Sequence, residues 1–129
     1  MLEIGKTATV KTTVNNTNTA ETVGSGNLEV FSTPMMIALM EKAACEVLAD
    51  SLEAGHTAVG TQVNITHIAA SPVGMGITAT ATIESISGRE IKFAVVAHDD
   101  AGEIGNGTHT RFIVDEARFM DKTNMRKKS

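Results

Sequence analysis

Aromatic and cysteine residues are scarce in this sequence. Phe, Trp and Tyr together make up 3% of the 129 residues, and Trp and Tyr do not occur at all. The core must therefore be aliphatic. Hydrophobic residues make up 42% of the sequence, which is enough to build such a core. The one cysteine, Cys45, excludes an intrachain disulfide, and its place in an apolar helical pattern predicts a core side chain.

Long apolar runs and an excess of positive charge are missing as well. No apolar run approaches the ~20 residues that span a bilayer, and no signal-peptide pattern opens the chain. A net charge of −4 gives no general attraction to nucleic acid or to anionic membranes. The basic end at 126–129 is short, and we expect it to fray. These absences predict a cytoplasmic protein with no nucleic-acid or membrane partner.

What is present indicates one domain over residues 1–129, built from a strand, a long helix and four further strands. The helix has the clearest signals, since Ser32 or Thr33 can cap it, Pro34 follows, and Gly55 ends the run. Lys42, Glu46, Asp50 and Glu53 form its solvent side. Strands are expected at 6–14, 58–70, 77–87, 90–99 and 103–115, the helix at 34–52, and a short terminal helix at 115–124.

One long apolar helix among antiparallel strands predicts an α+β domain. Turn residues at 87–89 and 99–102 indicate that successive strands of the last four pair antiparallel. The simplest arrangement is the hot-dog fold, a curved five-stranded sheet wrapped around one long central helix. A ferredoxin-like sandwich would need a second long helix. The open sheet edges predict a homodimer with sheets joined edge to edge, with a dimer of dimers left open.

Glu41 interrupts the apolar face of the helix that Ile37, Met40, Ala44 and Leu48 define. Such a carboxylate is either partly buried and held for a site, or a flanking residue that reaches water or pairs with Arg or Lys.

His67 falls on the apolar face of strand 58–70, where period-two alternation groups it with Val59, Val63 and Ile65. It is either a hydrogen-bonded core residue or a catalytic one. Thr33 is either the helix cap or a site hydroxyl beside free N–H groups that favour a developing oxyanion. A hydroxyl, an imidazole and a carboxylate that converge in an apolar pocket suit attack on a carbonyl.

Three segments resemble the fluoroacetyl-CoA thioesterase-like hot-dog proteins. They are Phe31-Ser32-Thr33 leading into the helix that carries Glu41, the run VGTQVNITHIAASPVGM at 59–75, and the run GNGTHTRFIV at 105–114. Arg118-Phe119 follow, so that the resemblance extends from about residue 28 to 120.

The resemblance implies an acyl-CoA thioesterase in which Thr33, Glu41 and His67 are catalytic. His67 would act as general base or position the nucleophile, Glu41 would polarise water or attack, and Thr33 would orient. The thioester carbonyl would lie near the backbone N–H of Gly60, and two sites would form at a homodimer interface. Because CoA is part of the substrate, neither a cofactor nor a metal is expected.

The chain departs from the specialised family pattern at one place. Selection of the fluorinated acyl group relies on an aromatic lid, and residues 15–30 contain no aromatic residue. We therefore expect a short or medium acyl-CoA as substrate. Arg111 is expected to be structural or to lie near the CoA phosphates, and His109 is expected on a different strand face from Arg111.

Three other functions compete with hydrolysis. A non-catalytic acyl-CoA-binding module would use the same pocket, although a pure binder needs no charge in the apolar face. A hydratase or dehydratase would need an Asp–His pair, and the acidic neighbours of His98, Asp99 and Asp100, look like turn residues. A purely structural dimer would not need polar residues on apolar faces.

Overall fold

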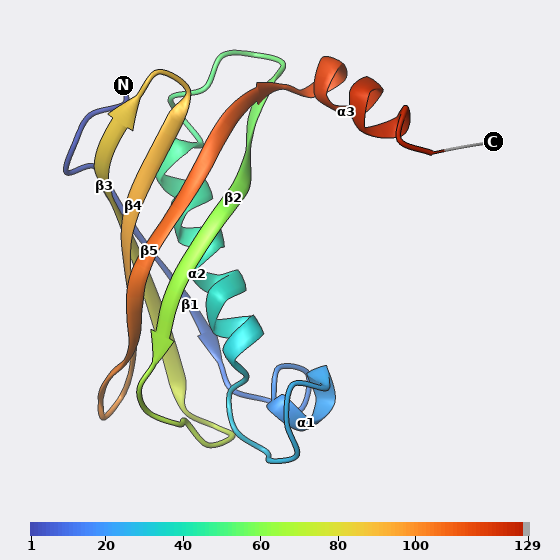
Figure 1. The fold of residues 1–129 in the computed structure, drawn as a ribbon. Helices are drawn as coiled ribbons and strands as arrows, with labels where there is room; N and C mark the ends of the chain where they lie inside the picture. The colour runs from blue at the N-terminus through green and yellow to red at the C-terminus, as the bar shows by residue number, and fades with distance from the viewer. Residues whose placement is uncertain (128–129) are drawn as a thin grey trace.

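The computed structural model describes residues 1–127, and in it a single curved sheet wraps around one long helix (Figure 1). Lys128 and Ser129, which belong to the predicted basic end, lie outside the described residues. The elements in chain order are β1 (Thr7–Thr13), α1 (Ala20–Val23), α2 (Thr33–Leu48), β2 (His56–His67), β3 (Gly76–Ser87), β4 (Glu90–Asp99), β5 (Gly102–Asp115) and α3 (Glu116–Asn124). Within residues 1–127, no helix has both the length and the apolar character needed to cross a membrane.

The five strands are ordered β1-β3-β4-β5-β2, and every neighbouring pair is antiparallel. Strands β3, β4 and β5 follow one another as the tight turns predict. The expectation that β2 pairs with β3 is wrong, since β2 lies beside β5 at the far edge (Figure 1). The link between β2 and β3 contains Pro72 and Gly74 and is long enough to cross the end of the sheet.

Helix α2 supplies much of the core, but it is shorter than the sequence predicts. It ends at Leu48, which is its last buried residue, instead of continuing to residue 52. Asp50 then lies near the start of β1, since the Nζ atom of Lys6, the residue before β1, is 2.6 Å from its Oδ1 atom. The residues of α2 that are buried are Met36, Leu39, Met40, Ala43, Ala44, Val47 and Leu48.

The predicted core position of Cys45 is wrong, because its side chain is exposed. The apolar arc of α2 is wider than the surface that one sheet covers, and Cys45 lies on the uncovered part. The predicted solvent side is confirmed, since Lys42, Glu46, Asp50 and Glu53 are all exposed.

A β-bulge interrupts β2 between Gly60 and Gln62, which pair with Arg111 and Thr110 of β5. The extra residue reverses which side chains face the helix. Ala58 before the bulge and Ile65 after it both pack on the core. Grouping Val59 with Ile65 on one inward face was therefore wrong, because uninterrupted alternation does not hold across the bulge.

Candidate active site

Thr33 is free to make contacts outside helix α2 because Ser32 caps the helix. The hydroxyl of Ser32 accepts a hydrogen bond from the backbone N–H of Met35 at 3.2 Å, and Ser32 has extended backbone dihedrals. Thr33 is thus the first helical residue and is exposed. Of the two predicted capping residues, the structure selects Ser32.

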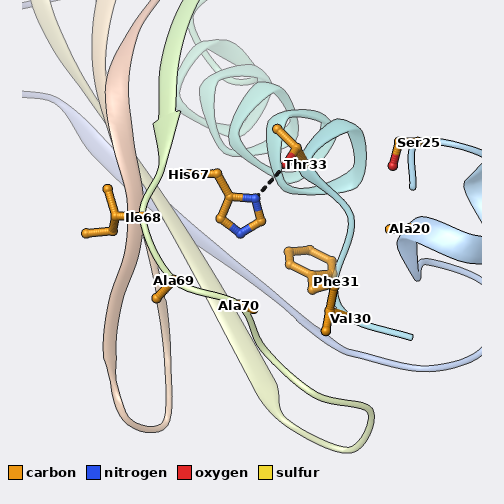
Figure 2. Close-up of a pocket in the computed structure, with 9 residues that line it drawn as sticks. All are labelled: Ala20, Ser25, Val30, Phe31, Thr33, His67, Ile68, Ala69 and Ala70. Atoms are coloured by element: carbon orange, nitrogen blue, oxygen red, sulfur yellow. Dashed lines mark hydrogen bonds between the residues drawn. The ribbon is translucent and has the colours of Figure 1, made fainter. Parts of the chain in front are cut away.

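His67 lies at the end of β2, directly opposite the start of α2. Its Nδ1 atom is 2.7 Å from the hydroxyl oxygen of Thr33, as Figure 2 shows. The apolar strand face on which the sequence places His67 therefore faces the start of the helix. Its Nε2 atom is buried and has no hydrogen-bond partner of ordinary geometry within residues 1–127.

Burial lowers the pKa of His67 from its ordinary value of 6.5, and the nearby Ala69 backbone opposes this only in part. The imidazole ring of His67 is therefore neutral at pH 7. When Nδ1–H donates to the Thr33 hydroxyl, Nε2 is left as the acceptor that a general base needs.

A cavity of about 300 Å³ adjoins the Thr33–His67 pair. Phe31 forms one wall next to the imidazole ring, and Ala69 and Ala70 follow His67 along the chain (Figure 2). Ile68 also follows His67 along the chain. The other lining residues come from α1 and from the segment between α1 and α2, and they are Ala20, Ser25 and Val30.

Glu41 is located elsewhere on α2, at the edge of its buried face. Its side chain is 39% exposed, so it flanks the apolar stripe rather than lying within it. The Oε2 atom accepts a hydrogen bond from the Nη1 atom of Arg111 at 3.2 Å. The Nη2 atom of Arg111 donates to the carbonyl of Ala58 at 2.8 Å. Of the two expectations for Arg111, these contacts support the structural one.

Gly60 allows the Glu41 carboxylate to approach β2 closely. A Cβ atom at this position would lie 2.6 Å from Oε2 of Glu41 and 3.4 Å from Nη1 of Arg111. A side chain there would have to displace the carboxylate, so the carboxylate and the Gly60 backbone are immediate neighbours.

His109 lies in this region, although the sequence did not place it among the candidate site residues. Its side chain is 1% exposed, and its Nε2 atom lies 3.2 Å from Nη1 of Arg111 and 3.8 Å from Oε2 of Glu41. The prediction that His109 and Arg111 lie on different strand faces was wrong. They are two residues apart in β5, and a period of two places such residues on the same face.

The predicted site residues thus form two groups within one chain. Thr33 and His67 meet at the start of α2, and Glu41, Gly60 and Arg111 meet further along it. No hydrogen bond within residues 1–127 connects Glu41 to Thr33 or His67. The same described residues contain no group of three His, Cys, Asp or Glu side chains arranged to hold a metal ion.

A family model described as fluoroacetyl-CoA-specific thioesterase matches residues 14–117. The chain belongs to this family. A fluoroacetyl-CoA thioesterase from Streptantibioticus cattleyicolor is 41% identical over 98 residues, which are 76% of this chain and 70% of that protein.

Solved structures agree with this assignment. The crystal structure of a variant of the fluoroacetyl-CoA-specific thioesterase has a TM-score of 0.92 and 33% identity, and the match covers 98% of each chain. A Thermus thermophilus protein described as a thioesterase superfamily member has a TM-score of 0.88 and 26% identity, over 95% of this chain and 91% of that one. A hot-dog-like protein from Thermanaerovibrio acidaminovorans shares the fold, with a TM-score of 0.89 over 98% of this chain and 93% of that one.

Membership of this family confirms the predicted hot-dog fold and the predicted enzyme class. The protein is an acyl-CoA thioesterase, that is, a thioester hydrolase. One relative has been solved with fluoroacetate and CoA bound, which agrees with an acyl-CoA substrate for the family.

Proposed function

We propose that this enzyme hydrolyses short or medium acyl-CoA thioesters with Thr33, His67 and Glu41 as its active-site residues. The observation that carries the proposal is the 2.7 Å contact between the Thr33 hydroxyl and Nδ1 of His67. It joins a neutral imidazole to a hydroxyl at the first turn of a helix, beside a cavity.

The reaction needs a base, an attacking oxygen and a stabilised oxyanion. His67 takes the proton from the oxygen that attacks the thioester carbonyl carbon, and Thr33 orients that base. The carbonyl oxygen becomes negative as the C–O bond forms, and the backbone N–H of Gly60 stabilises it. The C–S bond then breaks, the CoA thiolate takes up a proton, and the net reaction adds water to give a free acid and CoA.

The cavity beside Thr33 supports a short or medium acyl group. Its volume of about 300 Å³ corresponds to roughly ten water molecules at ~30 Å³ each. Most of its lining side chains are small or aliphatic, and Phe31 is the one aromatic residue among them. This lining favours an ordinary acyl chain over selection of a fluorinated one by an aromatic lid.

We further propose that the active enzyme is a homodimer, with residues 1–129 as one domain in each subunit and a cytoplasmic location. Strand β2 is a 12-residue sheet edge, and Val63 on it is 45% exposed. Long unpaired edges promote association, and two-fold symmetry pairs a strand with its own copy. Glu41 makes no hydrogen bond to Thr33 or His67 of its own subunit. Glu41 of a second copy would therefore complete the site at each Thr33–His67 pair.

The dimer is tested by placing a charge on this edge. The Val63→Lys variant should be monomeric by light scattering and should lose most of its turnover. Val73→Lys, at a residue 53% exposed outside β2, is the matched control and should behave like the wild type. A dimeric, fully active Val63→Lys variant would exclude pairing through β2, and the measured mass separates a dimer from a dimer of dimers.

The hydratase alternative is not supported, because Asp99 serves the β4–β5 turn. Its Oδ1 atom accepts from the backbone N–H groups of Ala101 and Gly102, and its Oδ2 atom accepts from the Ser71 hydroxyl at 2.7 Å. The Ser71 hydrogen bond lowers the pKa of Asp99, which keeps it ionised rather than available as an acid.

Release of CoA thiol from a series of acyl-CoAs, from acetyl to long chain, tests the proposed function directly. Turnover should be highest for short or medium chains. Saturable acyl-CoA binding without thiol release would instead support a non-catalytic binding module, and a preference for fluoroacetyl-CoA would contradict the proposed specificity.

A further inference from the structure

His109 is a fully buried histidine that the proposed hydrolysis does not use. Its ring is 1% exposed and stacks on Phe93, with ring centroids 6.2 Å apart and an angle of 25° between the planes. Burial lowers its pKa from 6.5, and the positive charge of Arg111 also lowers it. A neutral histidine thus lies directly behind the Glu41–Arg111 ion pair.

The hydrogen bonds of His109 define its tautomer. The Nδ1 atom lies 2.9 Å from the carbonyl oxygen of Gln62, and a carbonyl oxygen can only accept. Nδ1 therefore carries the hydrogen, which leaves Nε2 as an acceptor. Nε2 faces the Nη1 atom of Arg111 at 3.2 Å, so Arg111 donates to it.

Arg111 has three acceptors from three different elements. Nη1 divides its two N–H groups between His109 on β5 and Glu41 on α2, and Nη2 donates to Ala58 on β2. Because Nε2 of His109 accepts from one N–H group of Nη1, the other N–H group of Nη1 points at the Glu41 carboxylate. The Glu41 side chain is partly exposed, and within residues 1–127 its hydrogen-bond partner is Arg111. The orientation of Arg111 therefore determines where the Glu41 carboxylate lies.

We propose that His109 is a positioning residue for thioester hydrolysis: it orients the Arg111 guanidinium, which in turn holds the Glu41 carboxylate against the Gly60 backbone. The inference rests on the proposed role of Glu41 in the active site. His109 itself does not touch the substrate.

Two substitutions separate the two hydrogen bonds of the ring. In His109→Gln, the amide oxygen can occupy the position of Nε2 and still accept from Arg111. In His109→Asn, the amide nitrogen can occupy the position of Nδ1 and still donate to Gln62, but the acceptor for Arg111 is lost. The exposed His98 on β4 provides a matched control as His98→Asn.

The Asn variant should lose on the order of 10²-fold in kcat, because the Glu41 carboxylate is misplaced. Its KM should be nearly unchanged, because substrate binding is unaffected. The Gln variant should keep most of the wild-type kcat, and His98→Asn should keep all of it. Equal loss of kcat in the Gln and Asn variants, or no loss in Asn, would overturn the positioning role. Lack of hydrolysis by the wild type would instead overturn the proposed function.

A second measurement does not depend on the variants folding. Nitrogen-15 NMR of the imidazoles in the wild-type protein should show His109 as the Nδ1–H tautomer at neutral pH. An Nε2–H tautomer would turn a donor toward Arg111 and would overturn the proposal whatever the activity is.

Discussion

Thr33 meets His67 at 2.7 Å because the capping of helix α2 is carried out by its neighbour. A threonine at a helix start ordinarily uses its hydroxyl to accept from the backbone of its own helix. Here Ser32 accepts from Met35, so the Thr33 hydroxyl is free to bond the imidazole. Under the proposed function, stability and chemistry are thereby divided between two adjacent hydroxyl groups.

This division predicts opposite effects for two neighbouring substitutions. Ser32→Ala should lower the free energy of unfolding by about 1 kcal/mol. Thr33→Val keeps the shape of the side chain and should change stability by less than ~0.5 kcal/mol, because the residue is exposed. It should lower kcat on the order of 10²-fold by removing the hydroxyl that orients His67. Urea unfolding and thiol release on both variants test this, and a strongly destabilised Thr33→Val variant would show that Thr33 is structural.

Glu41→Gln preserves shape and removes the charge. We expect kcat to fall roughly 10²-fold, since the proposed function gives the carboxylate a part in the reaction. The free energy of unfolding should fall by about 1 kcal/mol or less, because an ion pair with a partner that is 39% exposed contributes little. Glu46→Gln on the solvent side of α2 is the control. Unchanged turnover in Glu41→Gln would remove Glu41 from the site.

A methyl group at Gly60 would lie 2.6 Å from the Glu41 carboxylate oxygen and must displace it. Because that carboxylate ends a flexible, partly exposed side chain, Gly60→Ala should still fold. It should lower kcat on the order of 10²-fold by moving Glu41 away from β2. Gly76→Ala is the control, since the nearest atom to a Cβ there is 3.5 Å away. Wild-type kinetics in Gly60→Ala would mean that the position of Glu41 is unimportant.

The pH dependence of kcat/KM reports the base in the free enzyme. Burial lowers the pKa of His67 below 6.5, so the ring stays neutral and active at pH values where an ordinary histidine is already protonated. Activity should therefore fall with acidification only below pH 6.5. Burial lowers the pKa of His109 as well, so an NMR titration of both rings is needed to assign the transition. An acid transition centred above 6.5 would be inconsistent with His67 as the base.

The elements with local signals could be predicted from the sequence. Strand β4 has the predicted bounds because tight turns flank it, and α3 begins where Asp115 caps it. The short helix α1 was missed, because its four residues are too few to give a periodic pattern. The pairing of β2 with β5 was also missed, since no short-range signal shows that the connection from β2 to β3 crosses the end of the sheet.

The candidate site was predictable in composition but not in arrangement. His67 was correctly oriented because alternation holds after the bulge. The separation of Glu41 from Thr33 follows from their spacing of eight positions along α2, about 12 Å at ~1.5 Å per residue, and was therefore present in the sequence. The Glu41–Arg111 pair depends on tertiary packing, which the sequence does not show. His109 could have been found, because it is two residues from Arg111 and therefore shares its strand face.

The central claim is most directly tested by thiol release measured for the wild type and His67→Ala with the same panel of acyl-CoAs, from acetyl to long chain. Circular dichroism and thermal unfolding establish that the variant is folded, and His98→Ala serves as the histidine control. The account predicts that His67→Ala loses about 10²- to 10⁴-fold in turnover on every chain length while remaining folded. A folded His67→Ala variant with wild-type turnover would contradict it.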